Sequence, residues 1–352
     1  MRRTITSQIV KHAKKKDEDE DDLSQRSLVP SGSTLFNLMC SDKTKGSFAL
    51  GTMVNVIGDT SSGKSMLALT LLAEVCKYKR FAEHRLCYCD VEAALSFNIP
   101  RLFGRKLDQR LEFPEVETIQ DFHSDFFETL DGDNPCIYIL DSFDALTSSE
   151  ELDRSQKTIA AKKKGKEGPG SYGQEKTRGL SGILRQIVRK IRSTDSLLII
   201  ISQVRQNFNA GFYGAKYVRT GGQSLGHYAS HEVWLGARGK LKRNERVIGR
   251  ITSPKATKNR LTGKVREVEF PIYYDYGIDD IGSCIDFLVR EKFWKKKGNK
   301  IIASGLNFIG LQAKLIKHIE QKQLERNLKR LVGQCWNKIE MNLKLNRKDK
   351  YE

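Results

Sequence analysis

The chain has 352 residues, of which 61 are Lys or Arg and 43 are Asp or Glu, so its formal net charge at pH 7 is +18. Such an excess of positive charge indicates an anionic partner, nucleic acid before a membrane surface. No apolar run approaches the roughly 20 residues that a spanning helix needs, and the start of the chain lacks an apolar stretch of signal-peptide length. We therefore expect no membrane partner and a cytoplasmic location. The seven cysteines contain no CxxC pair, which argues against a zinc site or a disulfide framework.

The first thirty residues differ from the rest in their charge pattern and are expected to be an appendage to the folded domain. A basic run at 11–16 abuts an acidic run, Asp17–Asp22, in which every residue is Asp or Glu. Charge blocks of this kind are usually solvated.

From residue 31 onward, short β-rich apolar runs alternate with stretches of helical spacing. Strands that are buried on both faces and alternate with helices indicate an α/β domain with a largely parallel sheet. The runs are Met53–Ile57, Leu86–Cys89, Ile137–Leu140 and Leu197–Ile201, and the helical stretches include Ser65–Tyr78 and Leu180–Ile191.

Two polar segments interrupt this pattern, and a basic segment ends it. Residues 147–178 are long for a connection without secondary structure, which suggests a functional or a disordered loop. Residues 206–222 are expected to be a second loop, which mixes aromatic residues, glycines and two cations. No Asp or Glu occurs from 196 to 231. Residues 291–352 carry 16 Lys or Arg against 6 Asp or Glu and are expected to be mainly helical.

Residues 58–65 match the phosphate-loop pattern G-x-x-x-x-G-K-[ST], with a predicted strand before it and a helix after it. Main-chain N–H groups and the helix N-terminus would surround the phosphates of ATP. Lys64 would neutralise the β- and γ-phosphates and Ser65 would bind Mg²⁺. A Gly-rich turn without function is the alternative, which the Lys and Ser disfavour. The residues are Gly58, Asp59, Thr60, Ser61, Ser62, Gly63, Lys64 and Ser65.

Three polar side chains follow other predicted strands. Asp141 can hold the water shell of the metal across the sheet from Ser65. Glu92 is the natural general base, because it would lie at the carboxyl edge of the sheet, where phosphates bind. A plain surface acid is the alternative for Glu92. Gln203 can donate an amide hydrogen bond to a γ-phosphate.

Taken in order, these segments resemble the RecA family of homologous-recombination proteins, which includes related phage recombinases. The resemblance runs from about Pro30 to about Phe308. Many NTPases share the phosphate loop, whereas the double-glycine stretch at 220–230 and the Lys258-Asn259-Arg260 segment are more specific. Ser31 to Phe36, the segment 201–205 and Gly277-Ile278-Asp279 complete the pattern.

The resemblance implies a RecA-type ATPase core with a mainly parallel twisted sheet, an N-terminal appendage and a small basic C-terminal domain. It makes Glu92 the residue that activates water, and Gln203 the sensor that couples the γ-phosphate to the second DNA loop. Lys258 and Arg260 would reach the ATP of a neighbouring subunit, so hydrolysis would require assembly.

The resemblance also assigns DNA contacts to the two loops. The loop at 206–222 fits this role physically as well, because cations neutralise phosphates and aromatic side chains stack on bases. An ordinary surface loop is the alternative. On the first loop and its following helix the implied residues are Arg178, Ser181 and Arg185; on the second they are Arg205, Phe208, Gly221, Gly222 and Gln223.

Two positions depart from the family pattern. Ile99 stands where the family has an aromatic residue against adenine, and Phe97 or Phe103 can substitute for it. Thr60 replaces a glutamate of the family's phosphate loop. The change at Ile99 bears on which nucleobase the site recognises.

These observations predict three regions: a polymerisation segment at 1–30, an ATPase core at 31–282, and a basic domain at 283–352 that captures duplex DNA by phosphate contacts. For the last region, the solvated face of a helical pair is the alternative.

The leading hypothesis is an ATP-dependent recombinase that forms a homo-oligomeric helical filament on single-stranded DNA and exchanges strands with homologous duplex DNA. Single-strand-binding and loading proteins are further candidate partners. One alternative is a hexameric helicase with the same core, which the Lys258-Asn259-Arg260 segment disfavours. The other is a mediator paralogue that exchanges no strands, which the presence of Glu92 disfavours.

Overall fold

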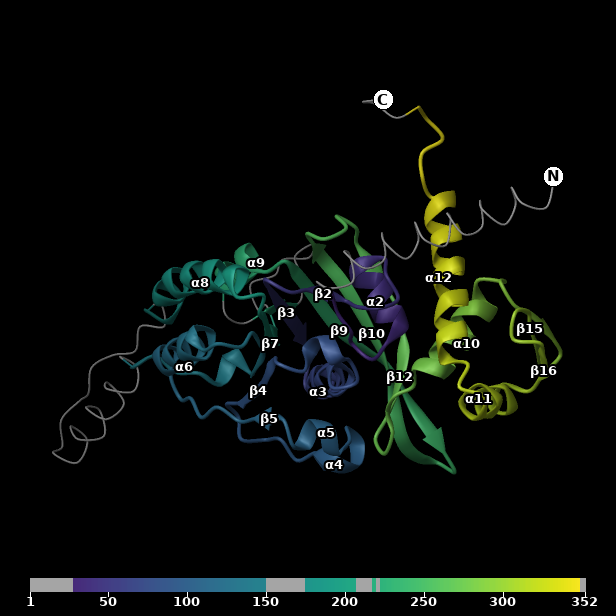
Figure 1. Ribbon diagram of the computed structural model, residues 1–352, viewed down its shortest axis with the longest axis horizontal. Helices are drawn as coiled ribbons and strands as arrows, with labels where there is room; N and C mark the ends of the chain where they lie inside the picture. Colours follow the sequence, from purple (N-terminus) through teal and green to yellow (C-terminus); the bar gives the residue numbers. More distant parts are fainter. Residues whose placement is uncertain (1–27, 150–174, 207–216, 220–221, 349–352) are drawn as a thin grey trace, which may run out of the picture.

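The computed structural model describes residues 28–149, 175–206, 217–219 and 222–348. Within them, an eleven-stranded sheet forms the centre of the molecule, with β11 (Arg266–Glu267) beside β10 and β8 (Tyr217–Arg219) beside β7 (Figure 1). Its main path is, in spatial order, β13 (Gly277–Ile278), β12 (Phe270–Tyr273), β10 (Arg246–Asn259), β9 (His231–Arg243), β3 (Thr52–Gly58), β7 (Leu197–Gln206), β6 (Cys136–Asp141), β4 (Arg85–Asp90) and β5 (Leu111–Glu112).

The strands from β9 to β5 run parallel to one another, and β10, β12 and β13 are added antiparallel on one flank. The α/β class with a mainly parallel sheet, predicted from the sequence, is confirmed. The four predicted strands are β3, β4, β6 and β7, and the two predicted helices are α3 (Lys64–Val75) and α8 (Glu175–Ser193).

Helices cover both faces of the sheet, which explains why the parallel strands are apolar without interruption. Because successive side chains point to opposite faces, Val54 and Val56 enter one core, while Met53 enters the other. The first core also contains side chains of α2 (Thr34–Ser41), α3 and α10 (Asp280–Arg290). The second contains side chains of α6 (Ile119–Asp131), α8 and α9 (Gly222–Tyr228).

Short elements connect these layers. A capping box fixes the start of α6, because Thr118 Oγ1 accepts from the Asp121 N–H and the Asp121 carboxylate accepts from the Thr118 N–H. The 3-10 helices are η1 (Lys79–Phe81) and η2 (Phe143–Ala145), and the short α-helices are α4 (Ile99–Leu102) and α5 (Arg105–Asp108).

The described chain begins with β1 (Leu28–Val29), which pairs with β2 (Phe48–Ala49) in a two-stranded sheet. Leu28 and Val29 are buried. Residues 28–30, which the sequence analysis assigns to the appendage, therefore belong to the folded body.

The C-terminal region differs from the helical segment that the sequence predicts. After α10, the strands β14 (Lys295–Lys297), β15 (Lys300–Ala303) and β16 (Phe308–Gly310) form a three-stranded antiparallel sheet. Helices α11 (Gln312–Gln321) and α12 (Glu325–Asn342) follow. The expectation of helix is therefore wrong for 295–310, and the expected boundary at residue 282 falls inside α10.

Helix α12 attaches this region to α10 and to the end of α2, beside the antiparallel flank of the sheet (Figure 1). The Trp336 ring lies 6.1 Å from the Phe287 ring, and Trp336 Nε1 donates to Asp42 Oδ1 over 3.0 Å. Lys264 donates to both Asp42 and Glu340, at 2.6 and 2.8 Å. Apolar and charged contacts together fix α12 on the core.

Both predicted loops are shorter than expected. Strand β7 continues to Gln206 and pairs antiparallel with β8, so the ends of the 206–222 segment form a hairpin, and α9 already begins at Gly222. Helix α8 begins at Glu175, inside the 147–178 segment. No helix in the described part of the chain is both long and apolar enough to cross a membrane.

Candidate functional site

The phosphate loop lies between β3 and α3, as its sequence pattern predicts. Two of its positions require glycine. Gly63 has φ of +100°, and a Cβ there would lie 2.7 Å from Ile272 Cδ1. A Cβ on Gly58 would lie 2.5 Å from Ser62 Oγ and 2.8 Å from the Leu235 carbonyl oxygen. The loop is therefore a tight turn held between its own side chains and the neighbouring strands.

Lys64 folds back over this loop. Its Nζ donates to the carbonyl oxygens of Gly58 and Asp59, each over 2.9 Å. Burial lowers the pKa of the Lys64 ammonium, although the negative charges of Asp141 and Glu92 oppose the shift. A partly buried ammonium held by main-chain carbonyls is a group that a phosphate can recruit.

Asp141 ends β6 opposite the start of α3. Its Oδ2 accepts from Ser65 Oγ over 2.6 Å and from the Tyr88 hydroxyl over 2.5 Å. Burial raises the pKa of the Asp141 carboxyl, although these two hydrogen bonds and the charge of Lys64 oppose the rise. A divalent cation beside this carboxylate would favour its ionised form.

This donor set fits Mg²⁺. A serine hydroxyl and a carboxylate are hard oxygen ligands, and Mg²⁺ in nucleotide sites binds through one or two protein oxygens together with substrate phosphates. Ser65 and Asp141 meet this requirement beside the glycine turn. We therefore assign them as the residues that would hold the metal.

Glu92 lies at the same edge of the sheet, after β4. Its Oε1 accepts from Gln203 Nε2 over 2.7 Å and from Ser142 Oγ over 2.5 Å. The main-chain N–H of Gln203 donates to Asp144 Oδ2 over 2.5 Å. The network thereby joins the ends of β4, β6 and β7, and every residue predicted for ATP hydrolysis in the same chain lies at this edge.

Sequence reasoning missed three residues of this edge: Tyr88, Ser142 and Asp144. Ser142 is adjacent to Asp141 and Tyr88 precedes Asp90 by two positions, so the alternation of strand side chains could have suggested them. Asp144 had no comparable signal, because its contact with Gln203 depends on how η2 turns after β6.

Lys258 and Arg260 do not lie at the edge of the sheet that carries the phosphate loop. Lys258 is paired with Glu232 at the start of β9, where His231 faces Val54, whereas the phosphate loop follows Gly58, which faces Leu235. At about 3.3 Å a residue, this register places Lys258 about 10 Å behind the phosphate loop along the sheet, and Arg260 further back. The structure does not bring these cations to the nucleotide site of their own chain.

The two cations instead hold the end of α9. Lys258 Nζ donates to the carbonyl oxygens of Gly226 and His227, and Arg260 Nη2 donates to that of His227 over 2.6 Å. Cations at a helix C-terminus stabilise its carbonyl groups and its dipole. Helix α9 begins where the second loop ends.

Comparison with known proteins decides the family. The family model described as the RecA N-terminal domain matches residues 5–279. The chain belongs to the RecA family. Among its relatives are Protein RecA of Nitratiruptor sp. (29% identity, covering 82% of this chain and 80% of the relative), of Geobacter metallireducens (28%, covering 80% of each) and of Caulobacter vibrioides (30%, covering 72% and 66%).

Membership of the RecA family confirms the resemblance read from the motifs. Of the residues that the family pattern assigns to DNA, Ser181 and Arg185 lie on α8, where Arg185 Nε donates to the Tyr228 hydroxyl of α9 over 3.4 Å. The helices that follow the two loops are therefore in contact.

The other predicted DNA residues are described only by their backbone or not at all. Arg178 is on α8, Arg205 on β7, and Gly222 and Gln223 begin α9. Phe208 and Gly221 lie outside the described residues.

The structure also places the three residues that the resemblance relates to adenine. Ile99 starts α4 and is buried in the first core, so its side chain is not available to a base. Phe97 and Phe103 are half-buried and meet edge to face, with ring centroids 6.0 Å apart. Phe97 and Phe103 stay the candidates for contact with the base.

Proposed function

We propose that this RecA-family chain is an ATP-dependent DNA recombinase that polymerises on single-stranded DNA, pairs it with homologous duplex DNA and exchanges the strands. The observation that carries the proposal is the 2.7 Å hydrogen bond between Gln203 and Glu92. It joins the candidate water-activating acid to the strand that leads into the second candidate DNA loop.

The chemistry proposed for the site is hydrolysis of the γ-phosphate of ATP. Glu92 would accept the proton of the attacking water, and Lys64 would leave the loop carbonyls to bind the phosphates. Mg²⁺, held by Ser65 and Asp141, would neutralise charge on the phosphate oxygens. Ser142 and Gln203 position Glu92, because both donate to the same carboxylate oxygen.

Coupling to DNA follows from the place of Gln203 on β7. The same strand pairs with β8 at residues 204–206, so the hairpin bounds the second loop three residues beyond the sensor. A displacement of this hairpin by DNA would alter the hydrogen bond to Glu92. DNA binding and hydrolysis would thereby depend on each other.

Assembly would supply the missing cations. Lys258 and Arg260 lie away from their own phosphate loop, so they can serve only the nucleotide of an adjacent copy. A head-to-tail interface of this kind repeats into a ring or an open helix. We propose the open helical filament, with residues 1–30 as its polymerisation segment.

The DNA partners would bind at two places. Single-stranded DNA would contact the loops at 147–178 and 206–222 together with α8 and α9. Duplex DNA would be captured by the C-terminal region, 283–352, where Lys295, Lys296 and Lys297 on β14 are all exposed. Contacts of this type are made to phosphates and carry no sequence preference.

The proposal is tested by measuring ATP hydrolysis without DNA, with single-stranded DNA and with duplex DNA, for the natural chain and for Glu92→Gln. We expect strong stimulation by single strands that Glu92→Gln abolishes while ATP still binds. Strand exchange between a single strand and a labelled duplex then separates a recombinase from a hexameric helicase, which unwinds without pairing. Bound ATP with no stimulation would contradict the proposal and favour a mediator.

A further inference from the structure

A large basic groove lies away from the nucleotide site. It has a volume of about 1040 Å³ and is enclosed by β1, the loop after α2, the end of α3 and helix α12. Glu74, on its wall, is ten residues along α3 from Lys64, which corresponds to about 15 Å of helix. The groove is therefore separate from the phosphate loop. We call it the basic groove after the cations that line it: Lys43, Lys45, Arg80, Arg326, Lys329 and Arg330.

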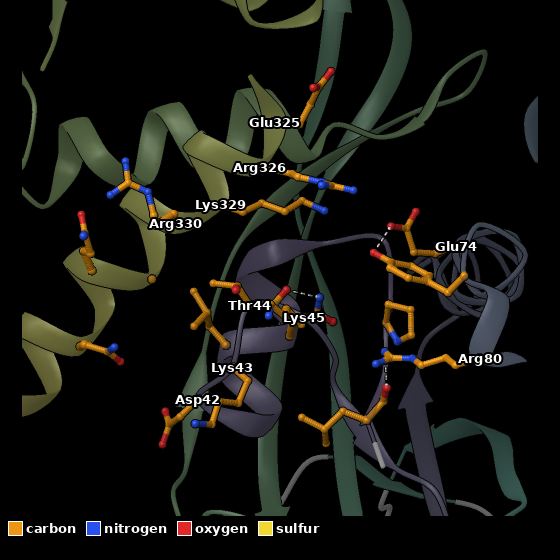
Figure 2. A pocket seen from close by; sticks show the side chains of 18 residues that line it. Asp42, Lys43, Thr44, Lys45, Glu74, Arg80, Glu325, Arg326, Lys329 and Arg330 are labelled. Carbon is orange, nitrogen blue, oxygen red and sulfur yellow. Dashed lines mark hydrogen bonds between the residues drawn. The ribbon is translucent and has the colours of Figure 1, made fainter. Parts of the chain in front are cut away.

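Side chains from distant parts of the chain meet across this groove (Figure 2). Arg326 and Lys329 extend from α12 towards the wall that carries Glu74, and Lys45 lies on the loop opposite. Arg80 Nη2 donates to the carbonyl oxygen of Leu28 over 3.0 Å, so the start of β1 is held at the edge of the groove.

Two of the three acidic residues that line the groove are already paired with cations outside it. Asp42 accepts from Lys264 over 2.6 Å, and Glu74 lies 2.6 Å from Lys77. Glu325 is the third. The acids of the lining therefore compensate little of its positive charge.

Four cations of the groove are exposed: Lys43, Lys45, Arg326 and Arg330. Within the described part of the chain, no Asp or Glu lies within ion-pair distance of Lys43, Arg326 or Arg330. Lys329, by contrast, has Asp280 at 3.7 Å. Four exposed cations on facing walls of one cavity form a site for an extended anionic ligand rather than for a single ion.

The same chain contains such a ligand close by. The acidic run, Asp17–Asp22, consists of six consecutive Asp or Glu residues, and Leu28 itself lines the groove. Asp22 is six residues from Leu28 and Asp17 is eleven, so extended chain reaches about 20 and 38 Å from the edge of the groove. A ligand tethered this closely has an effective concentration in the millimolar range.

We propose that the acidic run docks in the basic groove of its own chain and there competes with phosphate groups for the cations of α12. The acidic run and the groove have opposite charges, and the run lies close enough in the chain to reach the groove. When the run occupies the groove, it would lower the positive potential of the C-terminal region. When it leaves, α12 would become accessible to a polyanion. Because the cations are exposed, salt would weaken the contact.

Zero-length cross-linking tests the docking directly on the full chain. A carbodiimide joins a carboxylate to a lysine amine only when they touch. We expect amide links from residues 17–22 to Lys43 or Lys45, mapped by mass spectrometry and suppressed at 1 M salt, where the screening length is about 3 Å. Absence of such links at low salt would overturn the proposal.

A groove variant and a matched control sharpen the test. Arg326→Gln with Arg330→Gln keeps the reporter lysines but removes two cations, and should reduce these links about five- to tenfold. Lys338→Gln removes an exposed cation of α12 that does not line the groove and should leave them unchanged. Equal links in all three proteins would contradict the assignment of the groove.

The proposal concerns the chain before it assembles through residues 1–30. Mixing isotope-labelled and unlabelled chains without ATP or DNA therefore distinguishes docking in the same chain from docking in a neighbour. Links within one isotopic species support the proposal, whereas mixed species would overturn it. Duplex binding is a second readout: replacing the run by Asn and Gln should tighten it several-fold in the natural groove and much less in the Arg326→Gln, Arg330→Gln background. The same gain in both backgrounds would contradict competition for the groove.

Discussion

The two ends of the central sheet carry opposite charges that are held in different ways. At the carboxyl ends of β4, β6 and β7, the acids Glu92, Asp141 and Asp144 accept hydrogen bonds from residues of neighbouring strands, Gln203 on β7 and Tyr88 on β4. Beside the start of β3, the cations Lys258 and Arg260 donate to main-chain carbonyls at the end of α9.

The difference suggests how a nucleotide site would be regulated if two neighbouring chains share it, as we propose. We call the carboxyl ends of β4, β6 and β7 the acidic end and the region of Lys258 and Arg260 the cationic end. All residues of the hydrogen-bond network at the acidic end come from one chain. The cationic end is held by carbonyl groups, which are weaker partners for a cation than phosphate oxygens. Recruitment of Lys258 and Arg260 by a neighbour's nucleotide would remove the hydrogen bonds at the end of α9, and α9 also follows the second candidate DNA loop. Assembly and DNA binding would thus act on one helix.

The largest expected effect on ATP hydrolysis comes from placing a defect at the acidic end in one chain and a defect at the cationic end in another. Lys64→Ala damages the acidic end and Arg260→Ala the cationic end, so each alone should lower hydrolysis on single-stranded DNA about 10²- to 10³-fold. Mixed in equal amounts, the two variants should recover about one quarter of the activity, because a site formed between copies is intact in one case of four.

The matched control mixes Lys64→Ala with Glu92→Gln. Both changes lie at the acidic end, so no interface between these chains contains an intact site, and no recovery is expected. Full activity of Arg260→Ala alone, or no recovery in the Lys64→Ala and Arg260→Ala mixture, would show that the nucleotide site does not span two chains. Recovery in the control would show that Lys64 and Glu92 do not act from the same chain.

A smaller effect is expected from the link between Glu92 and the second loop. Gln203→Ala removes a hydrogen bond to a charged group, a loss of about 1.5–3 kcal/mol, and should lower DNA-stimulated hydrolysis about 10- to 100-fold. Ser202→Ala is the control, because Ser202 is buried and accepts from Asn55 Nδ2 on the other face of the strand. The measurement is the rate of ATP hydrolysis by each variant as single-stranded DNA is added. An equal loss of DNA-stimulated hydrolysis in the two variants would contradict the role of Gln203 as a sensor.

A comparison of Tyr88→Phe with Tyr138→Phe distinguishes an effect on the metal site from an effect on stability alone. Tyr88 donates to Asp141, whereas Tyr138 on β6 donates to Asp125 of α6 over 2.7 Å, away from the nucleotide. Each change to Phe should cost about 1–3 kcal/mol of unfolding free energy. Only Tyr88→Phe should shift the Mg²⁺ concentration for half-maximal hydrolysis, by a few-fold. An equal shift in both variants would assign the effect to the fold alone.

The last expected effect is a pH dependence at the cationic end, which concerns stability and not hydrolysis. His231, buried beside Asn259, donates from Nε2 to the Cys40 carbonyl oxygen over 3.2 Å, and burial lowers its pKa to about 4. The unfolded chain, with a histidine pKa of about 6.5, takes up the proton first as the pH falls. This stabilisation is therefore complete above about pH 6.5 and is lost towards pH 4, by up to about 3 kcal/mol.

Denaturant unfolding between pH 7 and 4 checks this sign. His231→Gln should flatten the slope relative to the natural chain, and His227→Gln, at an exposed position of α9, should not. An unchanged slope in His231→Gln would mean that other groups carry the acid sensitivity.

Much of the acidic end could be predicted from the sequence for one physical reason. Parallel strands end at the same edge of a sheet, so Ser65, Glu92, Asp141 and Gln203, each following an apolar run, had to be neighbours. Asp144 could not be assigned in the same way, because its contact with Gln203 depends on how η2 turns after β6. Tyr88 lies within β4 rather than after it, so only the alternation of side chains along the strand points to it.

The C-terminal region shows the opposite case. Lys295–Lys297 contains no strand signal, and the three-stranded sheet forms because Ile301 and Ala303 of β15 are buried with Trp294 against helices from other parts of the chain. The sequence by itself determined the α/β core, the phosphate loop and the family. Only the tertiary structure decided which end of the sheet carries Lys258 and Arg260, and that Lys43 and Arg326 line one groove, because both depend on contacts between segments far apart in the chain.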